Sequence, residues 1–250
     1  MKKDKLKWMI FAAMFAALTA AVAWFKIPLP FTPVPITLQT LLVLLSGAVL
    51  GAYYGALAMI IYLLLGAIGL PVFAGGSSGI GVLLGPTGGY LFSYPLAAFV
   101  IGKMTKSKKI SVIIKYLSFV VILIMVSIVA FDAIFNIGIM KLKAGSMVSA
   151  LSSQQRLFLI AISILVLAVL AALAKYSKSF KKLDFETVLA MFAGTAIIYA
   201  MGALQGKLVT GLAWNAIFVG WVLPFILGDT LKIILAAWIA KNTDMKRFMK

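Results

Sequence analysis

The sequence contains no histidine and no cysteine among its 250 residues, and it has only 6 acidic residues against 23 basic ones. The usual ligands of zinc, haem and iron–sulfur clusters are therefore missing. Catalytic arrangements built on Ser-His-Asp or Cys-His cannot be formed either. We therefore expect no metal and no cofactor, and we do not expect an enzyme.

Charged residues are also absent from the whole stretch between residues 27 and 102. The chain is 64% apolar and 12% charged, with a mean hydropathy of +1.13. An average soluble domain is about half apolar and about a quarter charged. Since a membrane-spanning helix needs about 20 apolar residues, this composition predicts an all-α polytopic membrane protein.

The alternation of apolar runs and loops predicts eight transmembrane helices, at residues 8–25, 38–50, 51–70, 90–102, 111–131, 157–174, 186–205 and 216–240. Prolines at alternate positions from 28 to 35 exclude a helix over residues 27–37, where we expect an extended loop. Glycines at 47, 51 and 55 indicate a close or bent turn between the second and third helices.

The basic residues predict the orientation. Four Lys or Arg lie in each of four segments: the N-terminal tail, the loops at 103–109 and 175–182, and the C-terminal tail. The opposite loops hold only Lys26, Lys141, Lys143, Arg156 and Lys207. Because cytoplasmic loops are enriched in positive charge, we expect an N-in/C-in protein of the plasma membrane. Topology thus accounts for the net charge of +17, and we expect no nucleic-acid binding.

Asp229 and Lys232 are charged residues within the last expected helix, three positions apart and so on one face. A charge at the centre of a membrane span costs about 2.5 to 3.5 kcal/mol, so such residues normally face a helix bundle or a water-filled cavity. The pair could hold helices together or bind a ligand. We favour a ligand with a carboxylate and an amide-like group.

Two uncharged loops carry further polar candidates, namely Thr37, Gln39, Thr40, Ser77, Ser78, Thr87 and Tyr90. Irregular backbone at membrane depth is tolerated only when it is buried or lines a cavity. These glycine- and proline-rich loops therefore predict a cavity. They lack the Gly-Lys-Ser or Gly-Lys-Thr of a phosphate-binding loop. If ATP drives transport, another chain must hydrolyse it.

A stripe of small residues, Ala12, Ala16 and Ala20, repeats every four positions along the first helix. Small residues let helices approach closely in a membrane. Close packing within the chain and docking of a partner helix are both consistent with this stripe.

Longer motifs carry a family resemblance. They are Pro-Phe-Thr-Pro-Val-Pro-Ile-Thr-Leu-Gln-Thr at 30–40, Gly-Ala-Ile-Gly-Leu-Pro-Val-Phe-Ala-Gly-Gly at 66–76, Gly-Pro-Thr-Gly-Gly-Tyr at 85–90, Val-Thr-Gly-Leu at 209–212 and Leu-Pro-Phe-Ile-Leu-Gly-Asp at 223–229. Over residues 1–104 and 183–240 the chain resembles the BioY family, the biotin-specific substrate-capture (S) components of energy-coupling factor (ECF) transporters.

The resemblance implies a six-helix membrane fold that binds biotin from outside. It also implies partnership with a membrane-embedded coupling (T) protein and a pair of ATPase subunits. The family's vitamin-binding Asp and Lys correspond to Asp229 and Lys232. Its loop motifs add Gln39, Thr87 and Tyr90 as substrate-binding candidates. The family's Ala-x-x-x-Ala docking pattern corresponds to Ala12, Ala16 and Ala20.

The chain departs from this pattern at residues 105–182, which add two helices that ordinary members lack. We therefore expect a single membrane domain: a six-helix S-component core (1–104 and 183–240), an inserted two-helix hairpin (105–182) and a basic cytoplasmic tail (241–250). An alternative function also stays open. The chain could be a self-sufficient secondary transporter or channel for a small carboxylate, with Asp229 and Lys232 as an ion relay.

Overall fold

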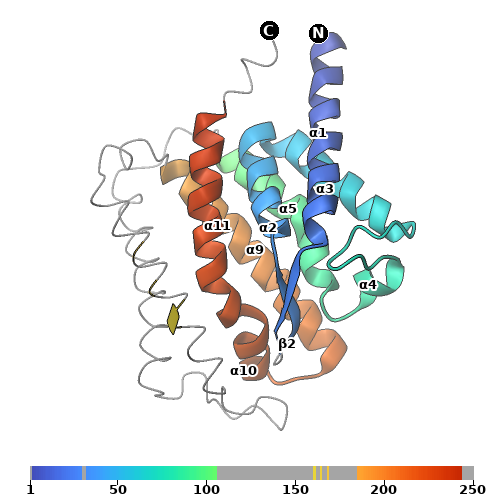
Figure 1. Cartoon of the computed structure of the whole chain (residues 1–250), viewed down its shortest axis with the longest axis vertical. Coiled ribbons are helices and arrows are strands. Elements are labelled where there is room, and N and C mark those ends of the chain that lie inside the picture. Colours follow the sequence, from blue (N-terminus) through green and yellow to red (C-terminus); the bar gives the residue numbers. More distant parts are fainter. Residues whose placement is uncertain are drawn as a thin grey trace.

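The structure, a computed structural model, describes residues 2–29, 32–105 and 185–243, together with the single positions 160, 161, 164 and 168. Figure 1 shows that the described part is mainly helical. Its first half contains α1 (Lys2–Ala23), β1 (Lys26–Leu29), β2 (Thr32–Thr37), α2 (Gln39–Leu45), the π-helical turn η1 (Ser46–Leu50), α3 (Gly51–Ala67), α4 (Ile80–Leu84) and α5 (Gly88–Thr105). Its second half contains α9 (Phe185–Thr210), α10 (Trp214–Ile217), the π-helical turn η2 (Phe218–Val222) and α11 (Leu223–Asn242).

Four helical stretches among the described residues are long and apolar enough to cross a membrane: Asp4–Ala23, Gln39–Ala67, Glu186–Thr210 and Phe218–Asn242. The expected helices at 111–131 and 157–174, with the hairpin that they would form, lie outside the described residues. α5 coincides with the expected span at 90–102 but is not among the four stretches. A membrane protein with several spanning helices is therefore supported, and the number of eight stays a prediction.

A sharp reversal separates η1 from α3. Gly51 has a φ of +79°, a conformation that side chains disfavour. A Cβ at Gly55 would lie 2.7 Å from the backbone oxygen of Ser46. Nine residues of straight helix would span about 13 Å, so the chain must fold back here. This confirms the bent turn predicted at these glycines, and it places α3 against η1.

The proline-rich segment is extended, as predicted, and it pairs with itself. β1 and β2 form an antiparallel hairpin in which Lys26 lies opposite Thr37 and Ile27 opposite Ile36, with an irregularity between Ile27 and Leu29. In Figure 1 this hairpin lies at the end of the helical bundle away from the start of α1 and the end of α11.

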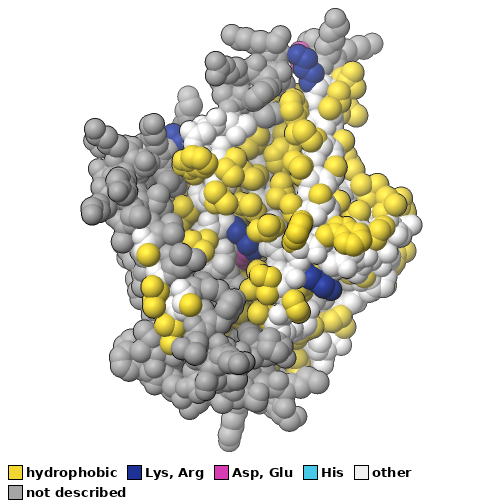
Figure 2. All heavy atoms as spheres, viewed as in Figure 1, with side chains coloured by type: hydrophobic (Ala, Val, Ile, Leu, Met, Phe, Trp, Pro, Cys, Tyr) yellow, Lys and Arg dark blue, Asp and Glu magenta, His cyan; other side chains and the backbone are white. Residues whose placement is uncertain are grey.

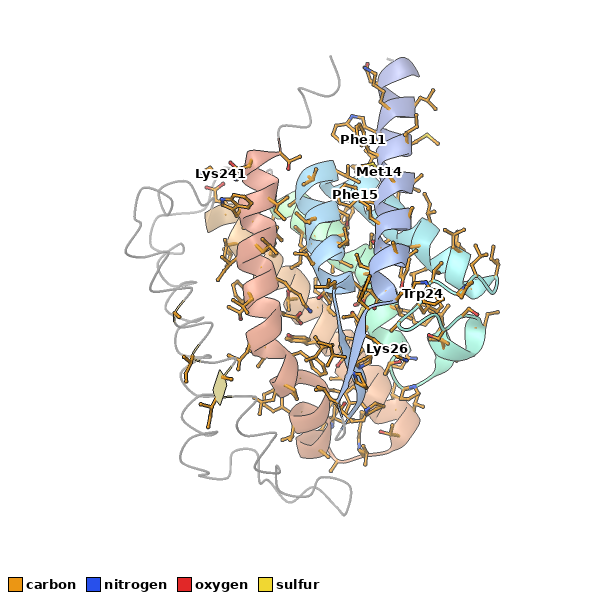
Figure 3. All side chains as sticks on the ribbon, viewed as in Figure 1. Phe11, Met14, Phe15, Trp24, Lys26 and Lys241 are labelled. Atoms are coloured by element: carbon orange, nitrogen blue, oxygen red, sulfur yellow. The ribbon has the colours of Figure 1, made fainter. Side chains whose placement is uncertain are left out.

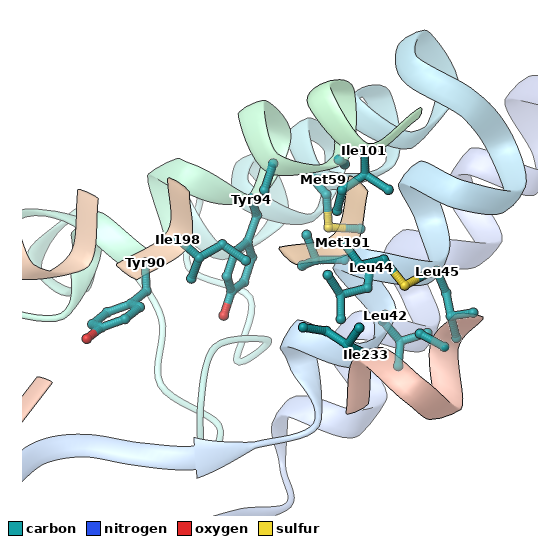
Figure 4. Close-up of a cluster of buried hydrophobic side chains, with 14 of the residues drawn as sticks. Leu42, Leu44, Leu45, Met59, Tyr90, Tyr94, Ile101, Met191, Ile198 and Ile233 are labelled. Carbon is teal, nitrogen blue, oxygen red and sulfur yellow. The ribbon is translucent and has the colours of Figure 1, made fainter. Parts of the chain in front are cut away.

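Apolar side chains fill the interior and also cover much of the outside. Figure 4 shows the packed centre, where Met59, Met191 and Ile233 are completely buried. Leu6 and Ile10 on α1 are 60% and 59% exposed. Figure 2 shows the corresponding hydrophobic surface. Helices that are apolar all round suit a membrane, because lipid rather than water surrounds them.

Candidate binding site

A cavity of about 270 Å³ lies where the hairpin, α2, the loop between α3 and α5, and helices α5, α9 and α11 meet. Its apolar walls come from Pro33, Val34, Pro35, Phe73, Ala74, Val82, Leu91, Ile198 and Phe225. Its polar walls come from Lys26, Thr37, Gln39, Thr40, Ser77, Thr87, Tyr90, Tyr94, Tyr199, Asp229 and Lys232. The cavity thus combines apolar walls with convergent polar groups, as small-molecule sites do.

Asp229 and Lys232 form an ion pair on the cavity wall. Lys232 Nζ lies 2.8 Å from Asp229 Oδ1, and the two side chains are only 13% and 7% exposed. The Thr40 hydroxyl accepts a hydrogen bond from Lys232 Nζ (3.0 Å) and donates one to Asp229 Oδ1 (3.1 Å). The Tyr199 hydroxyl donates to Asp229 Oδ2 at 2.6 Å. Three elements, α2, α9 and α11, therefore meet at one carboxylate.

This network compensates the charge of Asp229 inside the protein. Its carboxylate receives donors from Lys232, Thr40 and Tyr199. An ammonium group has three donors, and Lys232 uses two of them within the network. Asp229 is thus placed to orient Lys232, and the third N–H of Lys232 can serve a ligand.

Gln39 begins α2 directly after the hairpin and is held by two neighbours. Its Nε2 donates to the Tyr62 hydroxyl, and its Oε1 accepts from Thr37 at 3.0 Å. Tyr62 is completely buried, with its ring centroid 5.7 Å from that of Phe73 and 6.4 Å from that of Tyr94. Tyr62 is therefore a core residue that holds Gln39 in place.

Tyr90 and Thr87 lie at the start of α5. The Tyr90 hydroxyl donates to the backbone oxygen of Trp221 on η2, so its ring forms a fixed part of the wall. The preceding loop is tied to α9 because Gln205 Nε2 donates to the backbone oxygens of Leu83 and Gly85, both at 2.7 Å. The glycine-rich segment is thus anchored at the edge of the cavity.

The structure brings all five predicted substrate-binding residues, Asp229, Lys232, Gln39, Thr87 and Tyr90, to this one cavity. Their contact with a ligand stays a prediction. The sequence reasoning missed Tyr199, whose hydroxyl within the apolar run between Thr195 and Gln205 was the available signal. It named Thr40 only as one of the polar candidates of the uncharged loops, and it counted Lys26 only for topology.

The predicted docking stripe on α1 lies differently from expectation. Ala12 and Ala16 are completely buried and Ala20 is half-buried, because this face packs into the chain's own core. Of the two possibilities that the sequence left open, close packing within the chain thus applies to Ala12 and Ala16. The exposed face carries a second stripe with the same spacing, Ala13, Ala17 and Ala21. Ala12 and Ala16 therefore cannot offer a partner a surface in the folded chain.

Comparisons with known proteins agree with the resemblance seen in the motifs. A sequence model described as BioY family matches residues 1–182 and 158–248. A biotin transporter BioY from Thermotoga maritima is 53% identical over 104 residues, which are 42% of this chain and 60% of that protein. The chain thus spans about three fifths of that relative's length. A biotin transporter BioY from Rhizobium etli is 37% identical over 234 residues, 93% of this chain and 90% of that protein.

Among solved structures, a crystal structure of the S-component for biotin from an ECF-type ABC transporter matches with a TM-score of 0.62. It is 21% identical and the match covers 99% of this chain and 94% of that one, which shows a shared fold. With a family match along nearly its whole length and a relative that aligns over 93% of it, the chain belongs to the BioY family.

Proposed function

We propose that this chain is the biotin-capturing S-component of an ATP-driven ECF-type transporter. The relatives it matches are biotin transporters, and the solved structure with the shared fold is an S-component for biotin. The observation that carries the proposal is the cavity itself, which combines apolar walls with the buried network around Asp229 and Lys232.

Biotin suits this cavity chemically. The vitamin has an apolar ring and chain, a ureido group at one end and a carboxylate at the other. A volume of about 270 Å³ is close to the lower limit of about 300 Å³ for small-molecule pockets. We assign the free N–H of Lys232, and the side chains of Gln39, Thr87 and Tyr90, to ligand contacts. Asp229 holds Lys232 in position.

Tyr199 gives a test of this network. Replacing Tyr199 by phenylalanine removes the donor to Asp229 Oδ2 and keeps the ring. A hydrogen bond to a charged group contributes about 1.5 to 3 kcal/mol. We therefore expect biotin affinity to fall about tenfold in calorimetry, because the carboxylate that orients Lys232 loses one of its donors. Tyr53→Phe is the matched control, since Tyr53 is 79% exposed and does not line the cavity. Equal affinities in the two variants would contradict the assigned role.

The proposed partners are the T protein and the pair of ATPase subunits that the family resemblance implies. The sequence itself contains no phosphate-binding Gly-Lys-Ser or Gly-Lys-Thr, so ATP hydrolysis is assigned to these partners. Uptake of labelled biotin into vesicles tests this proposal. We expect uptake only when ATP-hydrolysing partners are present. Uptake by the chain alone, driven by an ion gradient, would favour the secondary transporter or channel. The fully hydrogen-bonded carboxylate of Asp229 supports a binding role over an ion relay.

For the topology we propose eight transmembrane helices in the plasma membrane, with both termini in the cytoplasm. The beginning of α1 and the end of α11 lie at one end of the bundle, and the hairpin that borders the cavity lies toward the other (Figure 1). The cavity would then open outward, toward an external vitamin. The chain has no cysteine, so single cysteines at Lys103 and Lys207 can be labelled from either side to check the orientation.

Residues 105–182 form, in this proposal, a peripheral two-helix hairpin outside a core made of residues 1–104 and 183–240. The described residues lining the cavity all belong to that core. A variant that joins Lys103 to Asp184 through a short polar linker should therefore keep biotin affinity within about twofold of the full chain. Calorimetry after a check of monodispersity measures this. Loss of binding in a folded variant would place the segment in the site.

A further inference from the structure

Lys26 brings a second positive charge to the cavity, apart from the Asp229–Lys232 pair. It is the first residue of β1 and lies opposite Thr37. Opposite residues of an antiparallel pair project to the same face, and both residues line the cavity. Figure 3 labels Lys26 at the hairpin, and Figure 2 shows basic side chains on this face that are separated by hydrophobic ones.

The charged residues that line the cavity differ in whether an oppositely charged partner neutralises them. Its charged lining residues are Lys26, Asp229 and Lys232. The latter two form an ion pair, so they contribute no net charge. Within the part of the chain that the structure describes, no ion pair or hydrogen bond is formed by the ammonium of Lys26, which is exposed. An anion entering the cavity would therefore find its uncompensated counter-charge at Lys26.

The end of the Lys26 side chain, with its positive charge, lies against the loop that contains Gly75. A Cβ at Gly75 would lie 2.3 Å from Lys26 Cε and 2.4 Å from Nζ, so the lysine end rests directly on the glycine backbone. That backbone is ordered by hydrogen bonds from Gly75 N to Ala23 O (2.8 Å) and from Phe73 N to Ser77 O (2.9 Å). Phe73 anchors the loop because its side chain is completely buried. A side chain larger than hydrogen at position 75 would displace the ammonium.

We propose that Lys26 recognises the carboxylate of the substrate and makes the site selective for ligands that carry one. The Asp229–Lys232 network would then meet the uncharged polar end, the ureido group of biotin. This inference rests on the proposed function, because it assumes that biotin occupies the cavity. In this inference Lys26 binds the carboxylate end of the ligand, and the Asp229–Lys232 network binds the ureido end.

The test compares biotin with its neutral amide, biotinamide, by calorimetry at low ionic strength. We expect the wild-type chain to prefer biotin about tenfold, as a charge-assisted hydrogen bond at a partly exposed site allows. Lys26→Met should lower biotin affinity to that of biotinamide and leave biotinamide binding unchanged. Lys26→Arg should keep the preference.

Each result of this comparison has one meaning. A Lys26→Met variant that still prefers biotin about tenfold would overturn the proposal for Lys26. A wild-type chain that binds neither ligand would instead overturn the proposed function.

Gly75 and Gly79 offer a second, matched comparison. Gly75 and Gly79 both have a positive φ, +69° and +90° respectively, so alanine strains the backbone at either position. A Cβ at Gly79 meets nothing within 4 Å, whereas one at Gly75 meets the end of Lys26. We expect Gly75→Ala to reduce the preference for biotin over biotinamide and Gly79→Ala to keep it. The same preference in both variants would contradict the proposal.

Discussion

Replacing Lys232 by alanine is expected to weaken biotin binding about tenfold or more. The change removes the donor that we assign to the ligand, and it leaves Asp229, whose side chain is 7% exposed, without its counter-charge. Breaking a buried ion pair in this way costs about 3 to 5 kcal/mol. Thr40 and Tyr199 still donate to the carboxylate, so the protein should remain foldable. Calorimetry with biotin measures the effect, and binding of biotinamide should fall with it.

Asp229→Asn tests the other half of the pair. The amide has the shape of the carboxylate but leaves Lys232 without its ion-pair partner, so we expect weaker biotin binding here as well. Lys103→Ala is the control, because Lys103 is exposed and does not line the cavity. If Lys232→Ala and Asp229→Asn both bound biotin as tightly as the control, the site assignment would be wrong.

We propose that the exposed face of α1 meets the T protein of the proposed transporter. A leucine at Ala17 is then expected to block assembly with that protein and to leave biotin binding unchanged. Ala17 lies on the exposed face of α1, in line with Ala13 and Ala21. Small side chains on one face let a second helix approach closely, and a leucine would hold it away. Co-purification of the T protein with the variant measures assembly, and calorimetry measures biotin binding.

Ala16→Leu is the matched variant one position earlier. Ala16 is completely buried against the chain's own helices, so a leucine there overpacks the core at a cost of about 1 to 3 kcal/mol. We expect this variant to lose thermal stability, whereas Ala17→Leu should not. Normal assembly by Ala17→Leu would contradict docking at this face.

The sequence allowed prediction of features that depend on local chemistry. Prolines exclude a helix over residues 27–37 whatever surrounds them, and glycines at 51 and 55 permit the reversal between η1 and α3. A charged pair inside an apolar helix must avoid lipid, which is why Asp229 and Lys232 could be singled out without a structure.

Features that depend on distant contacts could not be predicted in this way. Tyr199 reaches Asp229 across 30 residues of sequence, and nothing in its own helix indicates that partner. The sequence also does not indicate which face of α1 packs against the rest of the chain. Ala16 and Ala17 belong to two stripes of identical spacing on a helix that is apolar all round. Periodicity alone therefore cannot predict which of the two stripes is buried.

The most direct measurement of the central claim is a titration of biotin into the purified full chain, without partner proteins and without ATP. The account predicts saturable binding at one site per chain, weakened by Lys232→Ala and unchanged by Lys103→Ala. Absence of biotin binding by a folded, monodisperse chain would contradict it.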